Sequence, residues 1–267
     1  MTYFGFLLRF LVVPILALLL ALIYDRRRRL SLPSSLRNLP AWAVVALHVV
    51  VAVLYTFPWD NYLVATRVWW YDPNLVTGIT LGWVPIEEYT FFVLQTLLTG
   101  LWLLWLAPRV EGAPDWAPDG QIRRLAVIVV GLLWLPTPFL LAARMVPATY
   151  LALILVWALP PVALQLVFGA DILWRYRRLV TAAVLVSTVY LWLADTVAIR
   201  LGIWTISSQQ TLGLNLPWGL PLEEAIFFLM TNVLISFGIT LALAEESRTR
   251  LRLFRRAFGM QTDSAEP

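Results

Sequence analysis

The chain has 267 residues, of which 60% are hydrophobic and only 13% are charged, and its formal net charge is +4. A soluble globular protein is about half apolar and about a quarter charged, so this composition excludes an ordinary soluble domain and indicates a protein embedded in lipid. The absence of cysteine and the single histidine exclude disulfides, thiolate chemistry and a multi-histidine site, so no metal is expected.

Seven apolar runs of about membrane-spanning length predict an all-α integral membrane protein with seven transmembrane helices. They lie near residues 3–24, 41–58, 85–106, 125–143, 148–168, 179–199 and 219–243. The first run is interpreted as a helix and not as a signal peptide, because it has no basic start, is too long and has no small-residue cleavage site after it. Asp25 and four consecutive arginines follow it and indicate a membrane surface.

The arginines, which supply all 20 of the Lys and Arg residues, predict the orientation. Sixteen lie after the first, third and fifth runs and in the C-terminal tail, whereas the opposite segments hold only Arg67, Arg144 and Arg200. We therefore expect a multi-pass cell-membrane protein with its N-terminus outside and its C-terminus in the cytoplasm. Because topology accounts for the basic residues, no nucleic-acid partner is expected. Residues after about 257 are predicted to form a disordered end.

One eight-residue motif occurs twice, 136 residues apart. Residues 85–92 read Pro-Ile-Glu-Glu-Tyr-Thr-Phe-Phe, and residues 221–228 read Pro-Leu-Glu-Glu-Ala-Ile-Phe-Phe, with five of the eight positions identical. The duplication predicts that each half of the chain contains one copy of a three-helix unit.

Matching residues upstream of the motifs support the same division. An aspartate ends the second and the sixth run (Asp60 and Asp195), and a tryptophan follows each (Trp70 and Trp204). The fourth run then connects two repeats, which have the same orientation because an even number of spans separates them. This is a parallel repeat about an axis along the membrane normal, unlike an inverted transporter repeat. The expected boundaries are 1–106 for the first repeat, 107–146 for the loop and connecting helix, 147–246 for the second repeat and 247–267 for a basic cytoplasmic tail.

The two motifs place acidic residues at the start of two predicted helices. Proline is favoured at a helix start and carboxylates in the first turn complement the helix dipole, which is a purely structural explanation. The duplication favours a functional one, since ionisable residues in a membrane usually have a role and crowded carboxyl groups in an apolar site favour the neutral, proton-donating form. All six acids are expected at the non-cytoplasmic face and are predicted to be catalytic: Glu87, Glu88, Glu223, Glu224, Asp60 and Asp195.

Two phenylalanines follow each glutamate pair by one helical turn. Helical spacing places Phe92 and Gln95 on the face of Glu88, and Phe228 on the face of Glu224. Aromatic residues in membrane helices often serve packing or an interfacial belt, but their faces also stabilise a cation that water cannot solvate. Acids, aromatic rings and a dry site together indicate carbocation chemistry. The expected substrate-binding residues are Pro85, Phe91, Phe92, Gln95, Pro221, Phe227 and Phe228.

Several familiar motifs are absent from the sequence. No Gly-x-Gly-x-x-Gly follows a predicted strand and no Walker motif occurs, so no flavin, nicotinamide or other cofactor is expected. No pair of Asp-x-x-x-Asp segments could hold magnesium diphosphate, which argues against a prenyltransferase. A seven-helix rhodopsin is excluded because the retinal Schiff base needs a lysine and the chain has none. His48 is interpreted as a hydrogen-bonded packing residue outside the site.

The doubled Pro-x-Glu-Glu-x-x-Phe-Phe motif resembles the lycopene cyclase domain of heterodimer-type bacterial cyclases, whose two small three-helix subunits look like the two halves of this chain. Fused forms occur in archaea and, within bifunctional carotenoid enzymes, in fungi. The resemblance covers roughly residues 3–243 and implies redox-neutral lycopene β-cyclisation without flavin. By motif match it carries over Pro85, Glu87, Glu88, Phe91 and Phe92, and Pro221, Glu223, Glu224, Phe227 and Phe228. The assignment of the two aspartates rests on the repeat more than on the motif.

The resemblance implies an isomerase, or intramolecular lyase. A glutamic acid protonates the terminal double bond of a ψ end, the next double bond closes a six-membered ring, and a carboxylate removes a proton to give the β end. Lycopene would pass through γ-carotene to β-carotene in one pocket shared by both repeats, with the carotenoid and the bilayer as partners. The alternatives are a cyclase of C50 or another acyclic carotenoid, an enzyme that forms ε or γ rings, and a non-catalytic carotenoid-binding membrane protein.

Overall fold

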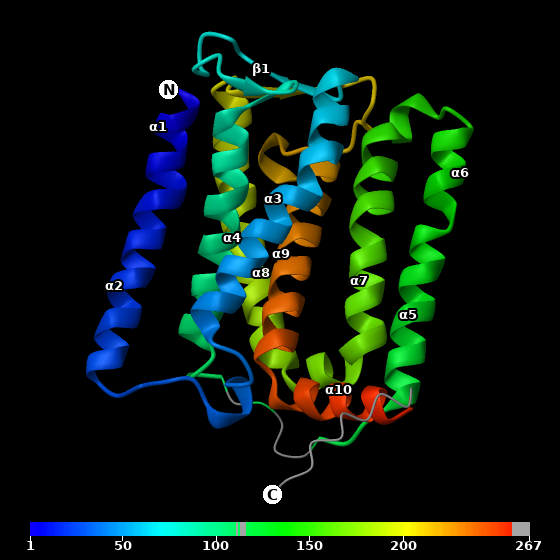
Figure 1. Ribbon diagram of the computed structural model, residues 1–267. Coiled ribbons are helices and arrows are strands. Elements are labelled where there is room, and N and C mark those ends of the chain that lie inside the picture. Colours follow the sequence, from blue (N-terminus) through cyan, green and yellow to red (C-terminus); the bar gives the residue numbers. More distant parts are fainter. Residues whose placement is uncertain (111, 113–115, 258–267) are drawn as a thin grey trace, which may run out of the picture.

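The computed structural model describes the chain except residues 111, 113–115 and 258–267 (Figure 1). The described part has seven helical segments long and apolar enough to cross a membrane, which confirms the predicted number. They pack side by side as a bundle and alternate in direction (Figure 1). In chain order they are α1, η1 and α2 (Tyr3–Leu7, Leu8–Val12, Val13–Arg27), η2 and α3 (Ser34–Leu36, Ala41–Ala65), α4 (Ile86–Leu106), α5 and α6 (Gly120–Trp134, Pro136–Ala142), η3 and α7 (Val146–Ala148, Thr149–Arg175), α8 (Arg177–Arg200) and α9 (Leu222–Leu243).

Two helices are longer than hydropathy predicts. The helix α3 continues through Pro58 to Ala65, so Asp60 lies inside the helix and not at its end. Proline removes one backbone hydrogen bond, but the rest of α3 remains regular on both sides. The helix α7 extends to Arg175, and only Tyr176 separates it from α8. The predicted loop after the fifth span is therefore a tight junction between two helices.

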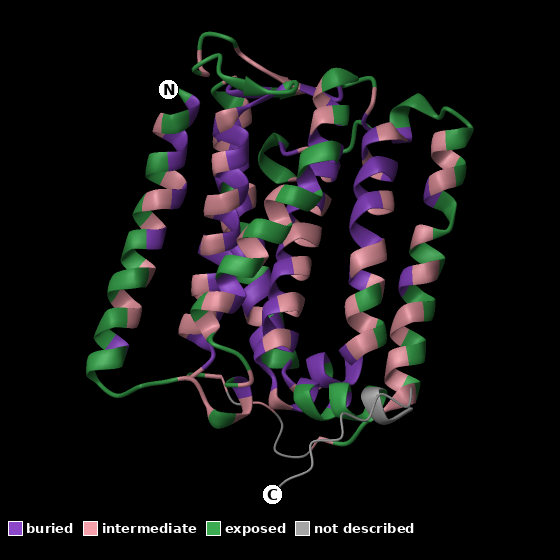
Figure 2. Ribbon diagram, in the orientation of Figure 1, coloured by how far each residue is buried: buried purple, intermediate pink, exposed green. Residues whose placement is uncertain are grey.

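The helices α4, α8 and α9 form the interior of the bundle. About half of the apolar window in each is buried (56%, 50% and 50%), against 6% for the α5–α6 span. Figure 2 shows the buried residues facing the centre and the exposed ones facing outward. Large apolar side chains such as Leu132 and Leu164 are exposed on the outer helices. The outer surface is thus suited to hydrocarbon, whereas water would penalise it.

Short strands cover one end of the bundle, which we call the upper end and which holds the N-terminus (Figure 1). The strand β1 (Trp69–Tyr71) pairs antiparallel with β4 (Trp204–Ile206), and β2 (Thr80–Leu81) pairs with β3 (Val84–Pro85). A 3-10 turn, η4 (Pro217–Gly219), precedes α9.

The pairing of β1 with β4 corrects one expected correspondence. Trp69 and Trp204 each follow the aspartate of their half by nine residues, and each lies opposite the third residue of the partner strand. Trp70 lies opposite Thr205 at the centre of the ladder. The tryptophan equivalent to Trp204 is therefore Trp69 and not Trp70, which shares only the chemical type.

A further helix, α10 (Glu245–Ala257), crosses the opposite, lower end of the bundle. Charged and apolar residues alternate along it, so one face can pack on the bundle while the other stays polar. The predicted basic tail, residues 247–267, is thus helical as far as Ala257, and the predicted disordered end lies outside the described residues.

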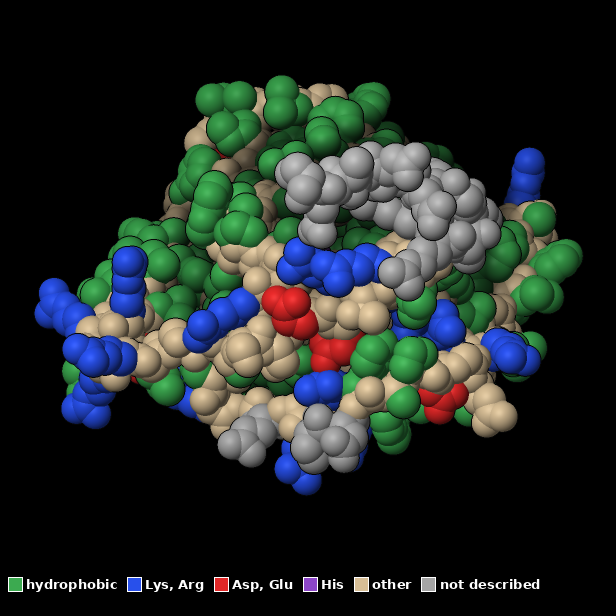
Figure 3. All heavy atoms as spheres, turned by 60° about the horizontal axis from the view of Figure 1, so that its bottom comes forward, with side chains coloured by type: hydrophobic (Ala, Val, Ile, Leu, Met, Phe, Trp, Pro, Cys, Tyr) green, Lys and Arg blue, Asp and Glu red, His purple; other side chains and the backbone are tan. Residues whose placement is uncertain are grey.

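Ion pairs fix α10 to α7 at the lower end. Arg250 is buried and pairs with the buried Asp171, and Arg175 lies 2.8 Å from a carboxylate oxygen of Glu246. Figure 3 shows that arginine side chains surround this end. The arginine-rich segments of the sequence therefore lie at the lower end of the fold, and the arginine-poor segments lie at the upper end.

Candidate active site

The structure brings the six predicted acids together at the upper end of α3, α4, α8 and α9. Pro85 and Pro221 cap α4 and α9 in an extended conformation, so each glutamate pair occupies a first helical turn. Ordinarily such carboxylates stay solvated, but all six are at most 8% exposed. The buried acids are Asp60, Glu87, Glu88, Asp195, Glu223 and Glu224.

Glu87 and Glu223 hold the loops that precede their helices. The backbone N–H of Thr77 donates to Oε1 of Glu87 at 2.6 Å, and that of Leu212 donates to Oε1 of Glu223 at 2.7 Å. Neither glutamate lines the cavity described below. The first member of each pair thus fastens a loop over the upper end.

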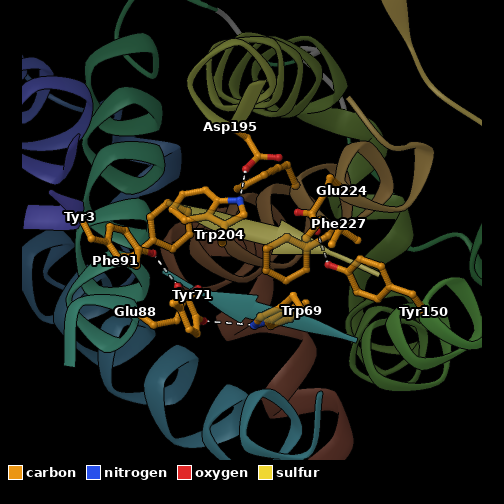
Figure 4. Close-up of a pocket in the computed structure, with 12 residues that line it drawn as sticks. Tyr3, Trp69, Tyr71, Glu88, Phe91, Tyr150, Asp195, Trp204, Glu224 and Phe227 are labelled. Carbon is orange, nitrogen blue, oxygen red and sulfur yellow. Dashed lines mark hydrogen bonds between the residues drawn. The ribbon is translucent and has the colours of Figure 1, made fainter. Parts of the chain in front are cut away.

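Glu88 and Glu224 instead face a buried tyrosine. The hydroxyl of Tyr3 donates to Oε2 of Glu88 at 2.5 Å, and that of Tyr150 donates to Oε1 of Glu224 at 2.6 Å. Both tyrosines are fully buried, and the close-up shows both pairs pointing into one space (Figure 4). A phenol O–H bound to a carboxyl group orients it and can share a proton with it.

The sequence interpretation missed these tyrosines. A usable signal is present, because Thr2-Tyr3 and Thr149-Tyr150 both open the first helix of a half, and the two pairs stand 147 residues apart. A single Thr-Tyr pair is too common to be noticed until the glutamate that it meets is known.

Each of these tyrosines packs on a tryptophan from the other half of the chain. The ring centroids of Tyr3 and Trp204 are 5.0 Å apart, and those of Tyr150 and Trp69 are 5.3 Å apart. The paired strands β1 and β4 carry the two tryptophans across the bundle. The two glutamate–tyrosine pairs therefore belong to one continuous cluster.

The surroundings of the two aspartates differ. The indole N–H of Trp204 donates to Oδ1 of Asp195 at 2.9 Å, whereas the indole N–H of Trp69 donates to the Tyr71 hydroxyl at 3.1 Å. Neither carboxyl oxygen of Asp60 has a hydrogen-bond partner among the described residues, although the side chain is fully buried. Asp195 lines the cavity and Asp60 does not.

Tyr71 is a second difference between the two halves of the site. Burial, followed by the nearby carboxylates of Glu88 and Asp60, raises the pKa of the Tyr71 phenol well above its usual range. The phenol therefore stays protonated and acts as a neutral polar group beside Glu88. Ile206 occupies the corresponding place in β4 and offers no hydroxyl.

Aromatic rings close the cluster on the side of the bundle centre. Phe91 and Phe228 approach to 6.0 Å between centroids, edge to face, and Phe227 stacks on Trp59 at 5.7 Å. The cavity between the rings and the acids has a volume of about 30 Å³, the space of roughly one water molecule. The side chains must move apart to admit an organic substrate. Its lining consists of Tyr3, Trp69, Tyr71, Glu88, Phe91, Tyr150, Asp195, Trp204, Ile206, Glu224, Phe227 and Phe228.

The remaining predicted residues lie elsewhere. Phe92 and Gln95 line a second, larger cavity towards the middle of the bundle, and Pro85 and Pro221 are helix caps that line neither cavity. The Nδ1 atom of His48 lies 2.7 Å from the Val44 carbonyl oxygen, in the second cavity. Within the described part of the chain, no three His, Asp or Glu side chains are placed to hold a metal ion.

Comparison with known sequences decides the family. The lycopene cyclase family model matches residues 2–106 and 144–242. The chain belongs to the lycopene cyclase family. Each matched segment spans one of the two tyrosine–glutamate pairs.

The chain is similar in sequence to proteins from archaea and fungi. It is 44% identical over 206 residues to a protein named lycopene beta-cyclase from Halobacterium salinarum, covering 74% of this chain and 81% of that protein. It is 39% identical over 200 residues to the bifunctional lycopene cyclase/phytoene synthase of Podospora anserina, covering 72% of this chain and 33% of that protein. The corresponding protein of Colletotrichum graminicola is 36% identical over 241 residues, covering 85% of this chain and 38% of that protein. No solved structure matches the chain.

Proposed function

We propose that this protein is a lycopene β-cyclase, an isomerase that closes both ψ ends of lycopene to β rings, giving γ-carotene and then β-carotene. The observation that carries the proposal is the pair of tyrosine-bonded glutamates, Glu88 and Glu224, buried in one aromatic-lined cluster. The printed names of the archaeal and fungal relatives support lycopene as the substrate.

The reaction needs one acid and one base. Either Glu88 or Glu224 donates a proton to the terminal C=C bond of a ψ end, which leaves a tertiary cation on the chain. The next C=C bond attacks that cation, forming the C–C bond of the six-membered ring and moving the positive charge into the ring. The other carboxylate then removes a ring proton, and a new C=C bond forms. One proton enters and one leaves, so the product is an isomer and no electrons are transferred.

The four other acids support this pair. Glu87 and Glu223 position the upper loops through their backbone hydrogen bonds. Asp195 lines the same cavity and is the second candidate for the proton-accepting carboxylate. Asp60 is fully buried and lies outside the cavity lining, so it does not touch the reacting atoms.

The aromatic rings protect the cation. Phe91, Phe227 and Phe228 lie beside the acids in a cavity with room for hardly any water. Their faces stabilise positive charge, and the exclusion of water prevents its capture as an alcohol. A protein that only binds a carotenoid has no need of two buried carboxyl groups against a hydrocarbon, so this alternative is less favoured. The ring type and the C50 alternatives depend on which proton is lost.

We further infer that the bundle is a parallel tandem repeat, α1–α4 and α7–α9, in which α5 and α6 form the connecting span. The tyrosine–glutamate contact and the glutamate–loop contact each occur in equivalent form in both halves, and the β1–β4 ladder pairs one strand from each half. The crossed Tyr3–Trp204 and Tyr150–Trp69 contacts support one composite pocket. The apolar outer surface and the basic lower end support membrane insertion with the lower end in the cytoplasm.

Expression in a lycopene-accumulating bacterium tests the proposal directly. The expected result is conversion of lycopene to β-carotene, with γ-carotene as the one-ring product, identified by chromatography and absorption spectra. The control is the double variant Glu88→Gln/Glu224→Gln, which should leave lycopene unchanged while reaching the membrane. A membrane-inserted parent protein that forms no ring contradicts the proposal, and ε- or γ-ring products select the alternative cyclase.

A further inference from the structure

A second cavity of about 320 Å³ lies between α3 and α7, deeper in the bundle than the acids. Its floor comes from α4 and α9, and its surface is mostly hydrocarbon and aromatic, although histidine, glutamine and threonine side chains also line it. The residues around it are Leu47, His48, Val51, Ala52, Tyr55, Thr56, Phe92, Gln95, Thr96, Trp157, Pro161, Gln165, Phe227, Thr231, Leu234 and Ile235. We call this space the α3/α7 groove.

The groove lies next to the cavity of the acid cluster, as a separate space. Phe227 lines both spaces, and Trp157 in the groove stacks on Trp59 at 4.5 Å between centroids. The hydroxyl of Tyr55 donates to the carbonyl oxygen of Trp157 at 2.9 Å and ties α3 to α7 beside this junction. A chain lying in the groove would therefore point one end towards the acids, and the Phe227 ring would have to move aside for that end to reach them.

The groove is open on the outer side of the bundle and closed at its lower end. Leu47 and Val51, which line it, are 59% and 53% exposed on the apolar surface. At the lower end, a Cβ atom at Gly238 would lie only 2.3 Å from Nε2 of His48, so this glycine is what allows the imidazole to pack there. The opening therefore faces the hydrocarbon of the bilayer and not the aqueous loops.

The equivalent place in the other half is filled. The hydroxyl of Tyr190 donates to the Phe10 carbonyl oxygen at 2.7 Å, matching the Tyr55 contact. Behind it, however, Asn232 is fully buried, accepts a hydrogen bond from Thr99 and donates one to Thr188. Among the described residues, this polar network occupies the position that the groove leaves open between α3 and α7.

We propose that the α3/α7 groove holds the polyene of the carotenoid, which enters sideways from the bilayer with one ψ end directed at Glu88 and Glu224. This inference rests on the proposed function. Along α9 the groove lining runs from Phe227 to Ile235, a rise of about 12 Å, which is less than half of the ~30 Å length of an extended C40 chain. The inner part of the substrate lies in the groove, and the longer outer part emerges between α3 and α7 into lipid.

Filling the groove tests this placement. Ala52→Phe adds a ring inside the groove, whereas Leu54→Phe is a matched change on the lipid-facing side of the same helix, where the side chain is 69% exposed. With purified protein in vesicles containing graded amounts of lycopene, we expect Ala52→Phe to lower kcat/KM about tenfold or more, mainly through KM. Leu54→Phe should stay within about twofold of the parent. Equal kinetics for a folded Ala52→Phe variant overturn the proposal.

A binding measurement removes the dependence on folding of that variant and on catalysis. The chain has no cysteine, so Val51→Cys and Leu54→Cys each give a single thiol, here in the inactive Glu88→Gln/Glu224→Gln background. A membrane-soluble maleimide should label Val51→Cys several-fold more slowly in vesicles with lycopene than in the same vesicles without it, and Leu54→Cys at one rate. Unchanged labelling of Val51→Cys overturns the groove, even if the parent cyclises lycopene. Protection together with an inactive parent would overturn the cyclase function and leave the carotenoid site standing.

Discussion

Exchanging single glutamates for glutamine separates the two members of each pair. In Glu88→Gln and Glu224→Gln, the side chain keeps its shape but can no longer donate or accept the reacting proton. In Glu87→Gln and Glu223→Gln, the amide oxygen can still accept the backbone N–H of Thr77 or Leu212. The structure therefore predicts a large loss of activity for the second member of each pair and a small one for the first.

The losses of activity expected for the two members of each pair have different physical causes. General acid or base catalysis by a positioned carboxyl group accelerates a reaction by about 10²–10⁴-fold, which sets the loss expected for Glu88→Gln or Glu224→Gln. A hydrogen bond to a charged acceptor exceeds a neutral one by about 1 kcal/mol, so loosening one loop anchor costs at most about fivefold in rate. The gap between the classes is more than tenfold.

The assay is the initial rate of ring formation in vesicles, with each variant quantified in the membrane. Because both glutamates belong to one pocket, Glu88→Gln and Glu224→Gln should each abolish nearly all one-ring product. Accumulation of γ-carotene at near the parental rate in either variant would mean that each half has its own site. A loss in Glu87→Gln as large as that in Glu88→Gln would refute the division of roles within the pair.

Three further outcomes are expected. Tyr150→Phe removes the 2.6 Å hydrogen bond to the buried Glu224 and should lower the free energy of unfolding in detergent by about 1.5–3 kcal/mol, and an unchanged unfolding midpoint would contradict that contact. A reporter fused after residue 256 should read as cytoplasmic, because the lower end carries most of the arginines, and a periplasmic signal would reverse the topology. Purified protein should cyclise lycopene without added flavin or nicotinamide, and an absolute need for reduced flavin would argue against a redox-neutral cycle.

Hydropathy and the duplicated motif predict most of the architecture, because both depend on local chemistry. The number of spans follows from apolar length, and the meeting of the acids at one end follows from the alternation of span directions. The end of α3 does not follow in this way. Pro58 suggests a stop in sequence, but packing of the residues beyond it, including Trp59 and Asp60, keeps the helix intact to Ala65.

The sequence does not show which glutamate of each pair anchors a loop and which one faces the cavity. Adjacent helical residues point about 100° apart, so only one member of each pair can face the interior cavity. Which one does so depends on the donors that approach the helix start. Those donors are the N–H of Thr77 for Glu87 and the hydroxyl of Tyr3 for Glu88, which lie 10 and 85 residues away in the chain. The second distance is a tertiary contact that no local pattern encodes.

The single open groove has a consequence for the order of the two cyclisations. Both reactive glutamates lie at the upper end, and the groove admits about 12 Å of a chain more than twice as long. Only one ψ end of a bound molecule can therefore meet the acids, and the second end must wait until the one-ring product leaves and returns reversed. During a single batch of labelled lycopene, γ-carotene should accumulate first, and an excess of unlabelled γ-carotene added to the vesicles should dilute the label in β-carotene. If the label passes undiluted to β-carotene, both ends react without release, and a second path to the acids must open on the side where Asn232 now packs.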